Sequence, residues 1–304
     1  MTLSHFVAVL TAISLNANPS VHAIPATINT TADVVAEQRQ LPAPPTKIRP
    51  EALGVEVSAK SALVVDVSSG ATLFAKDATV QRPIASLTKL VTAMVVLDQG
   101  LRPDELITIQ EEDFVDARPF FAVNDTLTRG DALRAMLAGS ANEISNAFAR
   151  TSSGGRVGFI EAMNAKAKKL GLTSAVLEDP TGINPRNRAN AVDVARLLRS
   201  ALGYPNIRET TTAEAYDAKT TGGKTVRIKP TNLLLTSYLN TSPYKIIAGK
   251  TGSLPDAGYC LAQVTQNADG HQIITVVLGS VDHFTRFQDV KALTAWAFQT
   301  YEWR

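Results

Sequence analysis

Short runs of apolar, β-branched residues stand near both ends of the folded part of the chain. Residues 61–75 give two such runs on either side of a Ser-Ser-Gly turn. Three more runs, at 244–249, 259–264 and 272–278, are separated by turn residues. Runs of this composition favour strands, and neighbours divided by turns favour antiparallel pairing. The pattern predicts an early hairpin and a group of adjacent antiparallel strands near the end.

Between these strands the apolar positions follow a helical spacing. Residues 86–98 are apolar almost all round, which is typical of a helix inside a core. Further helical patterns cover 130–138, 142–151, 156–170 and 191–202, ended by Gly and Ser breaks, and an amphipathic helix is predicted at 284–303. This order predicts an α+β fold, in which N- and C-terminal strands share one antiparallel sheet packed with a mostly helical middle region.

The first residues have a different character. Residues 1–23 contain no Asp, Glu, Lys or Arg, carry an apolar stretch from Phe6 to Leu15, and close on the small-x-small pattern Val21-His22-Ala23. The apolar stretch is shorter than the about 20 residues that a membrane-spanning helix needs. Residues 1–23 are therefore predicted to be a signal peptide, with no integral membrane segment in the mature chain. The Pro-rich residues 24–52 are predicted to be a linker or arm, and 53–304 the folded domain.

Composition excludes several classes of function. The net charge is only +2 and no basic run stands out, which argues against a nucleic-acid partner. The single cysteine, Cys260, cannot form an intramolecular disulfide and is expected to be a buried strand residue. After residue 23 only His271 and His283 remain, without the spacing of a zinc site, so a metallopeptidase is not expected.

A serine and a lysine stand three residues apart in Ser86-Leu-Thr-Lys89, at the start of the helix predicted over 86–98. Residues at i and i+3 share one helix face, so the amine can activate the hydroxyl. The positive end of the helix dipole favours the alkoxide character that a serine nucleophile needs. Lys89 can act as a base only when neutral, and burial or a second ammonium such as Lys250 would lower its pKa.

A second motif, Ser140-Ala-Asn142, stands at the break between two predicted helices. Its hydroxyl and amide can both point into one cleft, as a proton relay and a clamp for the substrate. Helix capping is the ordinary alternative for both residue types. The two roles can coexist.

A third motif, Lys250-Thr251-Gly252, is expected to end a strand. It offers a cation, a hydroxyl that can bind a carboxylate, and a glycine that lets an extended peptide add alongside. The backbone N–H groups of Ser86 and Ser253 can converge as an oxyanion hole. Ser-x-x-Lys alone carries little weight, because residues 242–245 match it too. The three motifs together indicate acyl transfer.

Ser-x-x-Lys, Ser-x-Asn and Lys-Thr-Gly in this order resemble the serine penicillin-recognising enzymes, β-lactamases and D,D-peptidases alike. Residues 63–70, 83–90, Met163-Asn164 and Thr181-Gly182 are similar to the D-alanyl-D-alanine carboxypeptidase and endopeptidase branch, and the similarity covers roughly 53–300. The resemblance implies a β-lactamase/D,D-peptidase-like fold. It implies peptidoglycan stem peptides as substrates, β-lactam antibiotics as inhibitors, and neither a metal nor an organic cofactor. The predicted signal peptide favours a periplasmic location.

The resemblance also assigns roles within the three motifs. It implies Ser86 as the nucleophile and Lys89 as its base, with Ser140 as relay and Asn142 as clamp. The residues implied to hold the substrate from the third motif are Lys250, Thr251, Gly252 and Ser253. Ala141 departs from the glycine that carboxypeptidases of the family often have.

Two subtypes of D,D-peptidase stay open. Residues 253–304 are too few for the β-rich domain and amphipathic membrane helix of the membrane-attached carboxypeptidases, so the chain looks more like the soluble endopeptidases. We therefore expect a Ser86 acyl-enzyme that cleaves peptidoglycan cross-links. Removal of the terminal D-alanine by a carboxypeptidase is the alternative.

Other functions are less favoured. A class A β-lactamase uses a glutamate in a Glu-x-x-Leu-Asn loop, and the nearest stretch, 161–164, is one residue short and lies in a helical pattern. A non-catalytic penicillin sensor is disfavoured because all the motif hydroxyls and amines are intact. Arg186, Arg188 and Asp256 are left undecided between substrate binding and ordinary solvated loops.

Overall fold

The structure is a computed structural model that describes residues 42–115 and 119–304. The predicted signal peptide at 1–23 and the larger part of the arm at 24–52 lie outside the described residues. Within the described ranges, no helix combines the length and the apolar character needed to cross a membrane.

A five-stranded antiparallel sheet forms the centre of the fold, in the order β10-β11-β12-β2-β3. Its strands are β2 (Ser61–Asp66), β3 (Thr72–Lys76), β10 (Lys245–Leu254), β11 (Gly258–Gln266) and β12 (Gln272–Ser280). Strand β12 pairs with β2, with Val276 opposite Leu63. The N-terminal hairpin and the three C-terminal strands therefore share one sheet, and the expected α+β fold is confirmed. Strand β10 lies at one edge of this sheet.

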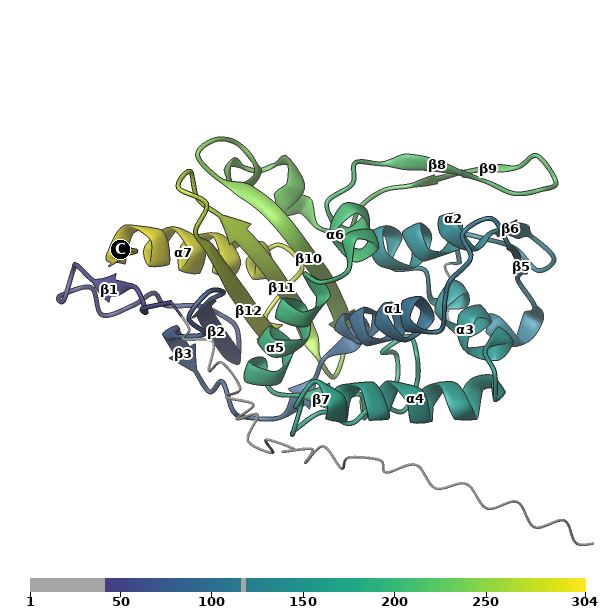
Figure 1. The fold of residues 1–304 in the computed structure, drawn as a ribbon, viewed down its shortest axis with the longest axis horizontal. Helices are drawn as coiled ribbons and strands as arrows, with labels where there is room; N and C mark the ends of the chain where they lie inside the picture. The colour runs from purple at the N-terminus through teal and green to yellow at the C-terminus, as the bar shows by residue number, and fades with distance from the viewer. Residues whose placement is uncertain (1–41, 116–118) are drawn as a thin grey trace, which may run out of the picture. The chain divides into compact units, whose positions relative to one another are not determined.

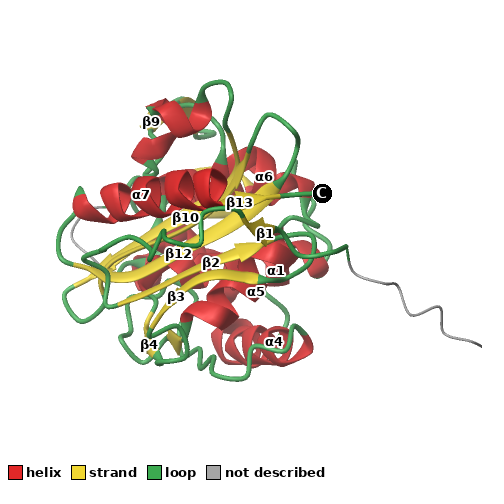
Figure 2. Cartoon of the chain, turned by 90° about the vertical axis from the view of Figure 1, so that its left-hand side faces the viewer, coloured by secondary structure: helices red, strands yellow, loops and turns green. Residues whose placement is uncertain are grey.

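Helices cover both faces of the sheet (Figures 1 and 2). They are α1 (Lys89–Asp98), α2 (Arg129–Arg134), α3 (Asn142–Thr151), α4 (Gly155–Lys169), α5 (Ala191–Ala201), α6 (Pro205–Thr211) and α7 (Thr285–Thr300). Alternate residues of β2 reach opposite faces: Val64 belongs to the core under α7, and Leu63 to the larger core with α1 and α5. This is the period of two that a strand imposes.

Helix α1 is buried along almost its whole length. Every residue from Lys89 to Val96 is buried, and neighbours on all sides exclude solvent. A helix that is apolar all round belongs inside a core, as its sequence predicts. Lys89 differs from the other buried residues of α1 because its side chain is of an ionisable type, and none of its surface is exposed.

The middle region is mostly helical, but it also contains short strands that the sequence pattern did not predict. Two small hairpins stand there, β5 (Leu106–Thr108) with β6 (Thr126–Thr128), and β8 (Tyr216–Lys219) with β9 (Thr225–Ile228). Strands of three or four residues are too short to show a period of two. Two further pairs join distant segments: β1 (Thr46–Lys47) with β13 (Tyr301–Glu302), and β4 (Arg82–Pro83) with β7 (Arg188–Ala189).

Single-turn helices complete the described elements. Four are 3-10 turns: η1 (Ala85–Thr88), η2 (Glu111–Asp113), η4 (Leu233–Thr236) and η5 (Tyr238–Asn240). The fifth, η3 (Ala135–Gly139), is a π-helical turn that continues α2. Ser86 of the first motif lies in η1, and Ser140 of the second motif directly follows η3. Both serines are thus placed where the chain departs from regular α-helix.

Candidate active site

Ser86 lies on the tight turn η1, one turn earlier than the α-helix that begins at Lys89. The preceding residue, Ala85, has φ +48°, a left-handed conformation that non-glycine residues rarely adopt. The turn is tied down by the Ile84 N–H, which donates to the carbonyl of Asn187 at 3.0 Å. A strained backbone held by its surroundings is common at reactive side chains.

The amine of Lys89 joins three segments of the chain. Its Nζ donates to Ser86 Oγ at 3.0 Å, to Asn142 Oδ1 at 2.6 Å and to the carbonyl oxygen of Thr181 at 2.6 Å. The first two motifs therefore meet at one amine. Thr181 was not among the predicted site residues, because it takes part through a backbone carbonyl that any residue would supply.

Ser140 follows the π-helical turn η3 and adopts the left-handed conformation, with φ +67°. Its hydroxyl accepts a hydrogen bond from Lys250 Nζ at 3.0 Å, and the same amine donates to the Thr251 carbonyl at 3.0 Å. Asn142, two residues on, is the first residue of α3. The left-handed residue between two helices thus turns the serine toward the edge strand β10.

Lys250 is almost completely buried, with 1% of its surface exposed. Burial disfavours the charged ammonium and holds the pKa of Lys250 well below its ordinary value, and the charges of Lys89 and Arg286 lower it further. Two lysines and an arginine thus lie close enough to repel one another. Such a positive cluster around two hydroxyls is suited to handling protons and binding an anion.

The third motif lies inside strand β10. The strand continues to Leu254, so the expectation that Lys-Thr-Gly ends the strand is wrong. A Cβ at Gly252 would lie 3.0 Å from the backbone nitrogen of Ser86 and 3.0 Å from the Ile84 carbonyl, so only glycine lets the strand approach the serine turn this closely. Thr251 contacts Thr231 through their hydroxyls at 2.6 Å, and Ser253 is exposed.

The loop after Asp179 positions the Thr181 carbonyl. One oxygen of Asp179 accepts from the N–H groups of Thr181 and Gly182 at 2.6 and 2.7 Å, and the other accepts from Asn184 N–H at 2.7 Å. Gly182 has φ +85°, and a Cβ there would lie 2.0 Å from the Ala85 carbonyl oxygen. The loop therefore packs directly against the turn that carries Ser86.

Arg286 is a site residue that sequence reasoning missed. It lies near the start of α7, is 3% exposed, and donates from Nη1 to the Gly252 carbonyl at 3.0 Å. Its guanidinium stacks over Phe287 and Tyr259, and no ion pair links it to a carboxylate in the described part of the chain. No local motif marks it, because its place is set by the packing of α7 on the sheet.

The remaining sequence candidates have no hydrogen bond to the three motifs in the described structure. Arg186 is exposed and pairs with Glu178, and Asp256 is exposed in the turn after β10. Cys260 is buried in β11, as expected. Among the described residues, no group of His, Cys, Asp and Glu could hold a metal ion.

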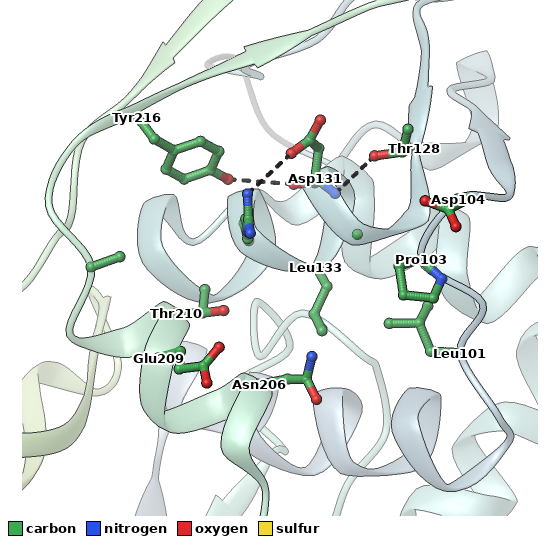
Figure 3. A pocket seen from close by; sticks show the side chains of 13 residues that line it. Leu101, Pro103, Asp104, Thr128, Asp131, Leu133, Asn206, Glu209, Thr210 and Tyr216 are labelled. Atoms are coloured by element: carbon green, nitrogen blue, oxygen red, sulfur yellow. Dashed lines mark hydrogen bonds and ion pairs between the residues drawn. The ribbon is translucent and has the colours of Figure 1, made fainter.

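A separate cavity of about 490 Å³ lies between α2, α6 and β8 (Figure 3). Across it, Tyr216 donates its hydroxyl to the Asp131 carbonyl at 3.3 Å, while Asn206 and Glu209 line another side. None of its thirteen described lining residues belongs to the three motifs. The cavity is therefore separate from the candidate active site.

Comparisons with known proteins point to one family. The D-alanyl-D-alanine carboxypeptidase family (peptidase S11) matches residues 46–282. A D-alanyl-D-alanine endopeptidase of Pseudomonas aeruginosa is 34% identical over 245 residues, 79% of this chain and 77% of that protein. The D-alanyl-D-alanine endopeptidase of Escherichia coli is 32% identical with the same coverage.

Solved structures agree with the sequence relatives. The Streptomyces K15 DD-transpeptidase superposes with a TM-score of 0.73 at 30% identity, over 81% of this chain and 99% of that one. The penicillin-binding protein D2 of Listeria monocytogenes, in its cefotaxime-bound form, gives a TM-score of 0.70 at 28% identity, with the same coverage. The fold that the resemblance implies is confirmed.

Proposed function

The chain belongs to the D-alanyl-D-alanine carboxypeptidase family of serine peptidases, and on that premise we propose that Ser86 attacks D-alanyl peptide bonds of peptidoglycan. The observation that carries the proposal is the 3.0 Å contact between Lys89 Nζ and Ser86 Oγ. A nucleophile and a base within hydrogen-bond reach, with the base held by further groups, are the parts that covalent catalysis requires.

The acylation step uses both lysines. In its neutral form Lys89 keeps two N–H groups for Asn142 and Thr181, and its lone pair faces Ser86. That lone pair takes the proton of Ser86 while Oγ bonds to the carbonyl carbon of the penultimate D-alanine. The C–N bond then breaks, and the leaving amine takes a proton relayed through the Ser140 hydroxyl. Lys250, 3.0 Å from that hydroxyl, stabilises the negative charge on the way. A water molecule next attacks the ester, releases the peptide carboxylate and returns a proton to Ser86.

The edge strand β10 supports an extended substrate. The carbonyl oxygen of the scissile bond lies between the N–H groups of Ser86 and Ser253, whose backbones approach where Gly252 meets the serine turn. Each such donor is worth about 2.7–4 kcal/mol of transition-state stabilisation in comparable hydrolases. Asn142, held by Lys89, presents its amide to the peptide backbone.

A substrate carboxylate next to the leaving amine is bound by the Lys-Thr part of the third motif, Lys250-Thr251-Gly252. Thr251 supplies a hydroxyl, Lys250 a positive charge, and Arg286 a second buried cation beside the Gly252 carbonyl. Both a terminal D-alanine and the acceptor side of a cross-link carry such a carboxylate. The site therefore accepts either leaving group on chemical grounds.

Endopeptidase action on cross-links is the subtype we favour. The endopeptidases of P. aeruginosa and E. coli are 34% and 32% identical to this chain. The carboxypeptidase DacF of Bacillus subtilis is 28% identical, and the match covers only 63% of its length. Such an enzyme acts on the cell wall, which lies outside the cytoplasm. Residues 1–23 have the pattern of a signal peptide for export to the periplasm.

Digestion of purified muropeptides separates the two subtypes. Conversion of cross-linked dimers to monomers, absent in Ser86→Ala, is the expected result for the protein without residues 1–23. Release of D-alanine from monomeric pentapeptides with dimers left intact would instead identify a carboxypeptidase. The Lys245→Ala variant, altered at an exposed lysine of β10, is the matched control and retains full activity.

A further inference from the structure

A second cavity, of about 240 Å³, is lined in part by strand β4, which precedes the serine turn in the chain, and has an excess of positive side chains. Its lining includes three cations and one carboxylate: Lys60, Arg82, Arg188 and Asp256. Pro83, Pro185 and Ala257 complete the wall. We call this cavity the basic pocket. It lies outside the three motifs.

The charges of the basic pocket are not neutralised within the described structure. No ion pair joins Lys60, Arg82 or Arg188 to a carboxylate there, and Asp256 has none either. Three cations facing one carboxylate leave an excess of positive charge in a concave surface. Such a surface concentrates anions.

The two arginines are held in place by hydrogen bonds to one side-chain hydroxyl and two backbone carbonyls. Arg82 donates from Nε to Ser61 Oγ at 2.7 Å and from Nη2 to the Lys60 carbonyl at 3.2 Å. Arg188 donates from Nη2 to the Gln81 carbonyl at 3.1 Å. The two side chains come from the paired strands β4 and β7, where Arg82 lies opposite Ala189. Each guanidinium keeps further N–H groups for a ligand.

Two lining residues of the basic pocket are close in the chain to the two proposed oxyanion donors, Ser86 and Ser253. Pro83 is three residues before Ser86, and Asp256 is three residues after Ser253. Three residues span at most about 11 Å of extended chain. A group bound in the basic pocket is therefore within reach of a peptide whose carbonyl lies at Ser86.

The direction of the substrate decides which part of it meets the basic pocket. In the proposed function the scissile carbonyl lies at Ser253 and the carboxylate next to the leaving amine lies at Thr251. The peptide thus runs antiparallel to β10, and its N-terminal side points toward Leu254 and the turn with Asp256. That side is the donor peptide that becomes attached to Ser86.

We propose that the basic pocket binds the charged side-chain end of the diamino acid that precedes the D-alanyl residue in the donor peptide. This inference rests on the proposed function. Arg82 and Arg188 bind a side-chain carboxylate, for which the guanidinium fork is suited. Lys60 adds positive charge, and Asp256 accepts from the amino group of the same diamino acid. A diamino acid without the carboxylate lacks the partner of the two arginines.

The test compares two peptides that differ in one carboxylate. Each ends in D-Ala-D-Ala, preceded by meso-diaminopimelate in one and by L-lysine in the other. Their power to protect Ser86 from a fluorescent penicillin is measured for the wild type, Arg82→Gln and Arg188→Gln. The matched control is Arg186→Gln, two residues from Arg188 but not in the lining of the basic pocket.

The wild type is expected to prefer the diaminopimelate peptide about tenfold or more, as befits a hydrogen bond to a charged group. Each pocket variant reduces that preference toward unity, labels normally with penicillin, and leaves protection by the lysine peptide unchanged. Equal protection by both peptides in the wild type, or an equal loss for both in the variants, overturns the inference. Failure of penicillin to label wild-type Ser86 overturns the proposed function itself.

Discussion

The Nζ atom of Lys250 lies 3.0 Å from the Oγ of Ser140, although the two residues are 110 positions apart. This contact joins the edge strand to the break between two helices. The Lys250 amine at this contact is buried, and desolvation is the chief cause that holds its pKa well below the ordinary value. The site is therefore held together by a group whose charge the fold opposes.

Replacing Lys250 should change how stability depends on pH. The unfolded chain binds a proton at the ordinary lysine pKa, about 10.5, and the folded protein binds it only at lower pH. The unfolded state therefore binds more protons between these two pKa values, so the penalty for burying Lys250 is greatest at low pH and fades toward pH 10.5. The free energy of unfolding of Lys250→Met minus that of wild type should therefore fall as the pH rises toward 10.5.

Urea denaturation at several pH values measures this difference. The control Lys245→Met, at an exposed lysine of the same strand, should give a difference that does not change with pH. A difference for Lys250→Met that is likewise independent of pH would show that the Lys250 pKa is not lowered by folding.

Ser140→Gly should reduce catalytic activity without lowering the stability of the fold. Ser140 is left-handed, with φ +67°, a conformation that glycine adopts freely. Loss of the relay hydroxyl should slow acylation of Ser86 by a peptide substrate by about 10²–10⁴-fold. Ser140→Ala, which keeps the Cβ, should lose as much activity yet be about 1 kcal/mol less stable than Ser140→Gly. Wild-type rates in either variant would exclude the relay role.

Gly182→Ala should unfold or severely weaken the protein. An alanine Cβ at φ +85° would lie 2.0 Å from the Ala85 carbonyl oxygen, which is fixed in the serine turn. Gly223→Ala provides the matched case, since φ is +83° there and nothing lies within 4 Å of the added Cβ. We expect about 1–2 kcal/mol for Gly223→Ala and at least about 2 kcal/mol more for Gly182→Ala. Thermal or urea denaturation that gives equal losses would show that the loop does not brace the serine turn.

The sheet and most of the helices could be predicted because their periods are long enough to read. Residues 61–75 and the C-terminal strands show apolar runs divided by turns, and 86–98 is apolar all round. The short hairpins β5–β6 and β8–β9 were missed because three or four residues carry no recognisable period. Helix α6 was missed although Pro205 stands at its first turn, a position that proline favours.

The candidate site was predictable where it depends on side-chain identity. Lys89 meets Ser86 at 3.0 Å, as the spacing of three residues indicates. The Thr181 carbonyl and the Arg286 guanidinium were not predictable, since one is a backbone group and the other reaches the site only through the packing of α7. The left-handed turn at Ser140 likewise depends on the π-helical turn before it, which no residue pattern marks.

The most direct test of the account is intact-protein and peptide mass spectrometry after incubation with a penicillin. The wild type should gain one penicillin mass, located on the peptide that contains Ser86, and Ser86→Ala should gain none. Lys89→Met, in which the contact to Ser86 Oγ is lost, should acylate at least about 10²-fold more slowly. An adduct on another residue, or none on the wild-type protein, would contradict the account.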